Sequence, residues 1–164
     1  MSEIQHTLVF LKPDAVKRKI MGRIITIFEE VGMRIVAAKM MKMTEEQAKN
    51  HYAVHADKPF FNRLVRSITQ EPIFVMVIEG VNAIACVRKM VGDSDPKLAD
   101  PSTIRGRFSH QSISSASAKD LAVNNVIHAA DSDTAALHEI RNIFDGSNEL
   151  TMLIYKNVDE SLTL

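Results

Sequence analysis

The sequence has little of several residue types, and each shortage excludes a class of protein. It contains no tryptophan and a single cysteine, Cys86. One cysteine cannot form an internal disulfide, so a small disulfide-stapled scaffold is excluded. Cys86 lies in an apolar helical pattern, which predicts a small core residue. The apolar runs are too short to span a bilayer, so no membrane partner is expected.

An excess of charge of one sign is also lacking. Lysine plus arginine and aspartate plus glutamate number 20 each, so the formal net charge is zero. A balanced charge gives no general electrostatic attraction to nucleic acid, and no nucleic-acid partner is expected. The first residues, M-S-E-I-Q-H-T, lack the basic and apolar segments of a signal peptide, so the cytoplasm is the expected location.

The overall composition of the chain is that of an ordinary globular protein. Its 164 residues are 46% hydrophobic and 24% charged, as in typical globular proteins. We therefore expect residues 1–164 to form one domain. The polar, serine-rich stretch at about 108–121 predicts a surface insertion, and residues 151–155 predict a short extended segment.

Hydrophobic periodicity predicts four strands alternating with helices. The expected strands cover residues 6–12, 34–42, 72–79 and a short stretch that ends at Ile127. The expected helices cover residues 22–31, with Val31 facing inward, and begin again near residues 44, 58, 82 and 131. Thr44 to Gln47 fits a capping box. Gly80 is expected to end the third strand, which is apolar on both faces and therefore central.

This order of elements is βαββαβ, with extra helices before the third strand. It predicts an α+β, ferredoxin-like sandwich, in which helices pack on one face of a four-stranded antiparallel sheet.

The stretch N-N-V-I-H-A-A-D-S-D, residues 124–133, holds the first candidate for chemistry. His128 follows the expected end of a strand and precedes a helix N-terminus, a position that favours contact with an anion. Glu139 lies in the following helix, within reach of the ring if the helix folds back. A carboxylate bonded to one imidazole nitrogen fixes the tautomer and leaves the other nitrogen as a nucleophile. By position alone, a histidine that merely fills a strand end is the commoner case.

Familiar catalytic motifs are missing from the sequence. It has no G-x-x-x-x-G-K-[ST] loop, no G-x-G-x-x-G fingerprint, no H-R-D or D-F-G set and no metal-spaced cysteine pair. What remains is His128 together with scattered cations, Lys12, Arg88 and Arg105. If these groups converge, they form a phosphoryl-transfer site.

Several stretches in one order resemble a known family. They are T-L-V-F-L-K-P-D-A-V near the start, H-Y with D-K-P-F-F in residues 51–61, P-S-T-I-R-G in 101–106, and N-V-I-H-A with D-S in 125–132. Together they resemble the nucleoside diphosphate kinases over most of the chain. The resemblance implies transfer of the γ-phosphate of a nucleoside triphosphate, mainly ATP, to a nucleoside diphosphate. It also implies a ping-pong mechanism, Mg²⁺ as cofactor and no protein residue as metal ligand.

The resemblance implies a role for individual residues. His128 matches the histidine that attacks through Nδ1, and Glu139 matches the glutamate that bonds its other ring nitrogen. The residues that match nucleotide-binding positions are Lys12, Tyr52, Arg88 and Arg105 at the phosphates, Asn125 at the ribose, Phe60 and Leu64 at the base, and Ser94 in place of a threonine. The resemblance also implies a homo-oligomer. A hexamer is more usual in the family than a tetramer, and the sequence does not choose between them.

Three departures from the family pattern stand out. Ala130 replaces a serine whose hydroxyl helps hold the glutamate, and losing one positioned hydrogen bond costs on the order of 1 kcal/mol. We therefore expect slower phosphoryl transfer. Val54 stands where an acidic residue is common, and the stretch between Arg107 and Asn125 is longer than usual.

Two other functions compete with an active kinase. A non-catalytic member of the same fold that binds nucleotide is suggested by Ala130. A ferredoxin-like nucleic-acid module needs aromatic side chains on strand faces and a basic surface, and the sequence has few of either.

Overall fold

The computed structural model describes residues 4–144. Its strands are β1 (Ile4–Leu11), β2 (Arg34–Met41), β3 (Ile73–Val81) and β4 (Ile127–Ala129). Its helices are α1 (Pro13–Lys17), α2 (Met21–Glu30), α3 (Glu45–His51), the 3₁₀ turn η1 (Ala53–His55), α4 (Phe61–Thr69), α5 (Ala83–Val91), α6 (Ile104–Phe108), α7 (Ile113–Ser117) and α8 (Asp133–Phe144). The extended segment expected at residues 151–155 lies outside the described residues.

The strands form one four-stranded sheet in the order β2-β3-β1-β4, and every neighbouring pair is antiparallel. β1 and β3 occupy the centre, as the apolar pattern of the third strand predicts. β4 pairs with the end of β1, and this register sets Phe10 opposite His128. The expected fold class is therefore confirmed.

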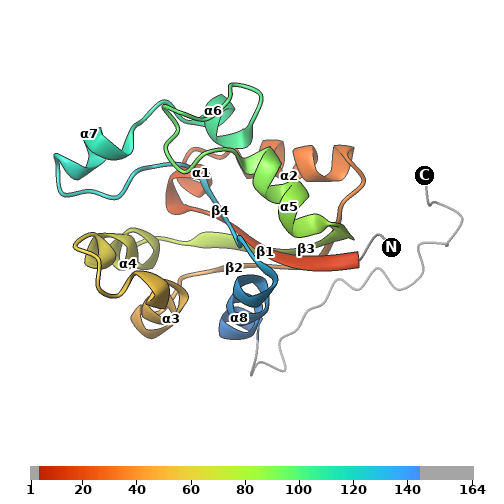
Figure 1. Cartoon of the computed structure of the whole chain (residues 1–164), viewed down its shortest axis with the longest axis horizontal. Helices are drawn as coiled ribbons and strands as arrows, with labels where there is room; N and C mark the ends of the chain where they lie inside the picture. The colour runs from red at the N-terminus through yellow and green to blue at the C-terminus, as the bar shows by residue number, and fades with distance from the viewer. Residues whose placement is uncertain (1–3, 145–164) are drawn as a thin grey trace, which may run out of the picture.

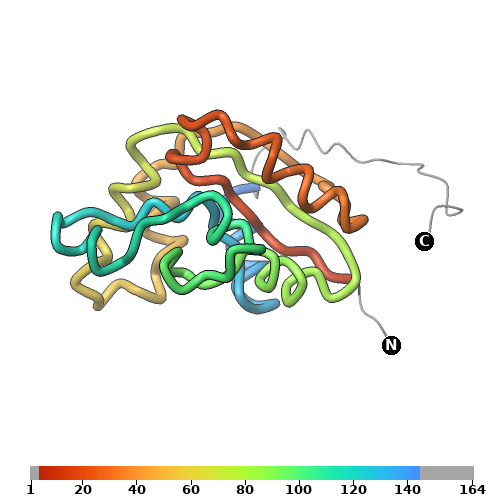
Figure 2. The backbone as a smooth tube through the Cα atoms, turned by 90° about the horizontal axis from the view of Figure 1, so that it is seen from above, coloured from red at the N-terminus to blue at the C-terminus, as the bar shows by residue number. Residues whose placement is uncertain are grey.

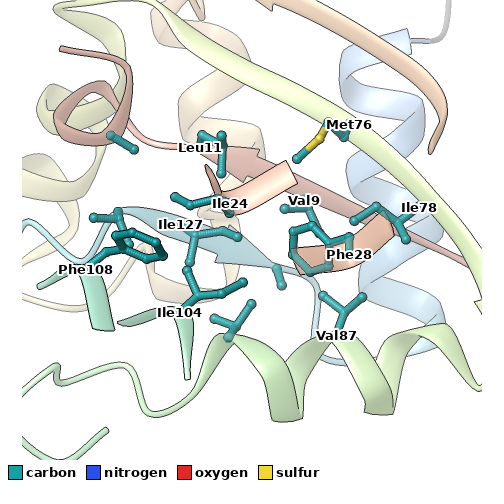
Figure 3. Close-up of a cluster of buried hydrophobic side chains, with 14 of the residues drawn as sticks. Val9, Leu11, Ile24, Phe28, Met76, Ile78, Val87, Ile104, Phe108 and Ile127 are labelled. Atoms are coloured by element: carbon teal, nitrogen blue, oxygen red, sulfur yellow. The ribbon is translucent and has the colours of Figure 1, made fainter. Parts of the chain in front are cut away.

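Helices cover both faces of the sheet, whereas the sequence predicted one covered face. Figure 1 shows α2 and α5 on one side of the sheet and α3 and α8 on the other. The first side holds a core in which Phe28 of α2 and Val87 of α5 pack against Val9 and Ile127 (Figure 3). The second side packs Ile68 and Phe144 on Leu8 and Phe10. Both faces are apolar because successive β1 side chains point to opposite sides and all are buried from Thr7 onward.

Several local predictions hold and several are wrong. Thr44 and Gln47 form the predicted capping box, with both bonds at 3.1 Å. β3 continues through Gly80 to Val81, because strand pairing with β1 persists there. Val31 is exposed, because α2 ends at Glu30. Cys86 is exposed on α5, since Ile84 and Val87 occupy the buried face of that helix.

The predicted insertion contains a short helix, α7, which the weak sequence pattern did not indicate. Figures 1 and 2 both place α7 at the same end of the molecule as α4. Arg63 of α4 bonds the Ser117 carbonyl at 3.4 Å, and Arg66 pairs with Asp120 at 3.3 Å. The segment is thus tied to α4 by polar contacts. Among residues 4–144 no helix is long and apolar enough to cross a membrane.

Candidate active site

His128 is the central residue of β4, not a residue beyond its end as the sequence suggested. Its ring stacks on Phe10 of β1, with centroids 4.8 Å apart and planes 20° apart. His51, the last residue of α3, meets the same ring edge-on, with centroids 4.5 Å apart. The nucleophile candidate is thus held between two rings, and its side chain is 20% exposed.

Glu139 reaches back from α8 to the His128 ring, as predicted. Its Oε2 lies 2.9 Å from His128 Nε2, and the carboxylate side chain is only 8% exposed. An ionised carboxylate accepts hydrogen bonds only, so the proton of the neutral ring belongs on Nε2. The lone pair of Nδ1 is then free to act as a nucleophile.

Electrostatics keep the His128 ring neutral. Burial, followed by the charges of Lys12, Arg105 and Arg88, holds the pKa of His128 well below its usual range. Burial also raises the pKa of Glu139 to about 7. The imidazole is therefore neutral at neutral pH, with its one proton on Nε2, whereas the Glu139 carboxyl is close to its own titration midpoint there.

Three cations lie around the ring, and backbone carbonyls hold two of them. Arg105 donates to the carbonyls of Gly92 and Ile127, each at 2.9 Å. Arg88 donates to the Ala129 carbonyl at 3.3 Å. These partners are dipoles without a full negative charge, and neither arginine is in a salt bridge within residues 4–144. Such a group of cations favours binding of an anion.

Lys12 is 8% exposed and donates to Asn125 Oδ1 at 2.6 Å. Burial, followed by the charge of Arg105, lowers the pKa of Lys12 to about 8, so the ammonium form still predominates at neutral pH. Asn125 in turn donates to the Ser94 carbonyl at 2.7 Å. These contacts join the end of β1, the loop after α5 and the approach to β4.

Val126 has a φ of 60°, a conformation that β-branched residues rarely adopt. Its carbonyl accepts from the Lys12 backbone N–H at 2.9 Å, and its own N–H donates to Asp14 at 3.2 Å. Backbone strain of this kind persists where surrounding contacts impose it, and it clusters at functional sites. Here it turns the chain between Asn125 and β4.

The remaining predicted residues divide into two groups. Tyr52 is buried beside His51, with ring centroids 4.8 Å apart, and Ser94 Oγ lies 3.5 Å from Arg105. The structure brings both toward the ring and the cations. Phe60 and Leu64 are partly buried at the start of α4, where Phe60 lies 5.7 Å from the ring of His55. Leu64 packs against the hydrophobic cluster that contains Phe10 and Tyr52.

The two single-residue departures have different surroundings. Ala130 is 1% exposed, packs with Ile84 and Ala136, and donates its backbone N–H to Leu8 at 3.1 Å. It lies two residues after His128 in the chain and presents no hydroxyl. Val54 is 84% exposed in η1 and contributes no charge.

Sequence reasoning missed three neighbours of the site, Phe10, His51 and Asp14. The signals were weak, because Phe10 looks like any core residue of a strand and His51 is simply the residue before Tyr52. Only the pairing of β4 with β1 and the packing of α3 and α8 bring Phe10 and His51 to His128, and Asp14 of α1 reaches the Val126 N–H just before β4.

The donor set does not suit Mg²⁺ as a protein-held ion. Among residues 4–144 the one cluster of potential metal ligands is His51, His128 and Glu139, whereas Mg²⁺ prefers oxygen ligands and is commonly held by substrate phosphates.

Comparison with known proteins agrees with this geometry. The family model described as "Nucleoside diphosphate kinase" matches residues 5–149. A nucleoside diphosphate kinase of Thermoplasma volcanium is 49% identical over 93% of this chain and 96% of the relative, and that of Pyrococcus abyssi is 48% identical over 87% and 86%.

Solved structures are also similar to this chain. A transition-state mimic of the Borrelia burgdorferi nucleoside-diphosphate kinase, with bound vanadate and ADP, has a TM-score of 0.87 at 39% identity and covers 96% of this chain and 95% of that one. The Halobacterium salinarum enzyme in complex with CDP has a TM-score of 0.78 at 40% identity, over 87% and 89%. The chain therefore belongs to the nucleoside diphosphate kinase family of phosphotransferases.

Proposed function

We propose that this kinase transfers the γ-phosphoryl group of a nucleoside triphosphate, mainly ATP, to nucleoside diphosphates through a phosphohistidine at His128. One observation carries the proposal. The 2.9 Å contact between His128 Nε2 and Glu139 leaves Nδ1 free in a ring whose pKa is lowered by burial and by three nearby cations.

In the first step Nδ1 attacks the γ-phosphorus, and the bond from phosphorus to the bridging oxygen of the diphosphate leaving group breaks. The ring then carries positive charge, which the Glu139 carboxylate stabilises through the Nε2–H bond. In the second step a nucleoside diphosphate oxygen attacks the phosphohistidine, and the ring returns to its neutral form. Both steps use the same pre-positioned groups.

Lys12, Arg88 and Arg105 are proposed to bind the phosphate oxygens. Tyr52 and Ser94 are proposed to contact the nucleotide beside them. Lys12, Arg105 and Tyr52 are buried and Arg88 is half-buried, which strengthens their electrostatic contacts. Asn125 is proposed to contact the ribose, because it lies against Lys12 at 2.6 Å. Phe60 and Leu64 are proposed to meet the base through apolar contact, which tolerates different bases.

Mg²⁺ supplies further charge neutralisation when it arrives with the nucleotide. The described residues bind and orient that complex and do not form a separate metal site. Assembly as a homo-oligomer, whether hexamer or tetramer, and location in the cytoplasm remain predictions from the sequence.

A two-step label transfer tests the function. The protein and a His128→Ala variant are incubated with γ-labelled ATP and Mg²⁺, and unlabelled diphosphates are then added. We expect acid-labile label on the original protein only, and several diphosphates should remove it. His138→Gln is a matched control, because His138 is an exposed histidine on α8, and it should accept label normally.

Binding of nucleotide without any label would instead support the non-catalytic alternative suggested by Ala130. The retained bond between His128 and Glu139 favours the catalytic reading. Helices on both faces of the sheet also leave no open strand face in residues 4–144 for base stacking of the kind used by ferredoxin-like RNA-binding modules.

A further inference from the structure

His51 is a buried polar side chain that the proposed mechanism does not use. It is 6% exposed, and within residues 4–144 neither of its ring nitrogens has a hydrogen-bond partner. Buried polar atoms are nearly always paired, and an unpaired one is costly. The unpaired nitrogens of His51 therefore call for a physical reason.

The surroundings of His51 point to the catalytic pair. A ring nitrogen of His51, a ring nitrogen of His128 and a carboxylate oxygen of Glu139 all lie within 4.8 Å of one another. Phe10 packs against the His51 ring at 5.2 Å between centroids. A hydrogen bond to Glu139 requires the His51 ring to move until its N–H and the carboxylate oxygen are separated by roughly 3 Å.

Charge also suits this contact. Burial, followed by the charge of His128, lowers the pKa of His51 to about 3, so the ring is neutral and carries one N–H donor. Glu139 must be ionised when His128 becomes positively charged, yet burial raises the pKa of its carboxyl to about 7. Of the charged groups that face this carboxyl, Asp131 raises its pKa, whereas His138 and Arg88 lower it.

We propose that His51 is a positioning residue whose ring N–H donates a hydrogen bond to the Glu139 carboxylate while His128 is phosphorylated. It thereby supplies a donor at a site where Ala130 presents no hydroxyl. The proton stays on His51 throughout, and no bond to His51 is made or broken. The inference rests on the proposed phosphohistidine mechanism.

Two substitutions separate hydrogen bonding from packing. His51→Phe keeps a planar ring against Phe10 and His128 but removes both nitrogens, whereas His51→Gln retains an N–H donor. Each is made in the original protein and together with Ala130→Ser, and the rate of phosphohistidine formation from γ-labelled ATP is measured in single turnovers across pH.

We expect His51→Phe to slow phosphorylation about tenfold, the effect of one hydrogen bond to a charged group. The fall of the rate toward acid should move about one pH unit higher, because the Glu139 anion loses a donor. His51→Gln should stay within about threefold of the original rate. Ala130→Ser should raise the rate about tenfold in the His51→Phe background but only about threefold in the original protein.

Equal effects of Ala130→Ser in both backgrounds, or an unshifted pH profile in His51→Phe, would overturn the proposal. The nucleotide affinity and the thermal midpoint of each His51 variant are measured as well. If both are unchanged, a slower phosphorylation does not come from a general loss of structure. If His51→Phe does not fold, His51→Gln and His51→Ala are compared in the same way, and equal rates for these two would refute the donor role. Absence of label on the original protein would refute the phosphohistidine mechanism itself, which is a separate outcome.

Discussion

The two sides of the His128 ring are built differently. On one side, Phe10, His51 and Glu139 enclose the imidazole with aromatic rings and a single carboxylate. On the other side, Arg88 and Arg105 donate to backbone carbonyls and form no salt bridge within residues 4–144. In the proposed mechanism the first side orients the nucleophile, and the second binds the phosphate groups.

This difference explains how a histidine works as a nucleophile in a strongly positive site. Burial and the same cations that are proposed to bind phosphate lower the pKa of His128, so the ring stays neutral. Glu139 then fixes which nitrogen is free. Changes on the cation side should therefore reduce binding of the transition state, while changes on the carboxylate side should alter pH dependence.

The largest effect is expected from removing a cation. Lys12→Met should lower kcat/KM about 100-fold or more, because a buried donor to the developing phosphate charge is lost together with its bond to Asn125. Steady-state kinetics with ATP and a diphosphate would measure it. Lys17→Met, an exposed lysine of α1, is the matched control. A loss of kcat/KM below threefold in Lys12→Met would contradict the proposal that the cations bind the phosphate groups in the transition state.

A smaller effect with a distinct pH signature is expected on the carboxylate side. The pKa of Glu139 is raised to about 7, so the carboxyl becomes protonated and a poorer acceptor as pH falls through that value. The phosphorylation rate should therefore fall toward acid. Glu139→Gln should lower the rate about tenfold at neutral pH and flatten this fall.

Single-turnover rates across pH would test the Glu139 prediction. Glu46→Gln, an exposed residue of α3, should keep the original profile. Persistence of the acidic fall in Glu139→Gln would assign the titration to another group.

The smallest effect is expected at position 130. Ala130→Ser introduces a hydroxyl beside the catalytic ring and should raise the rate about threefold. The gain is modest because, by our inference, His51 already supplies a donor to Glu139. The same single-turnover assay would measure it, with the thermal midpoint showing that the buried site accepts the hydroxyl. No rise in rate would contradict the expectation that Ala130 slows the reaction.

Much of the fold could be predicted from sequence because the apolar periodicity of β1, α2, β2 and β3 is strong. The covering of both sheet faces was harder to predict. Thr7 to Leu11 forms a continuous apolar run with one small polar residue, and such a run does not say which elements cover each side. Helix α7 was missed because a serine-rich segment has little periodicity.

The candidate site could be assembled residue by residue only through family resemblance. Nothing in the spacing of Lys12, Arg88 and Arg105 along the chain requires them to meet. The structure brings them together because β4 pairs with β1 and α5 packs against β4. The contact of Phe60 and Leu64 with a base remains a prediction.

The sequence by itself determined the order of elements, the capping box at Thr44 and the family to which the chain belongs, because these depend on local pattern and motif. Only the tertiary structure decided that His128 lies in the middle of β4, with its ring stacked on Phe10 and its Nε2 at 2.9 Å from Glu139. It also decided that the buried His51 ring packs against the rings of Phe10 and His128. These relations join residues far apart in the chain, and they arise from strand register and helix packing, which no local pattern specifies.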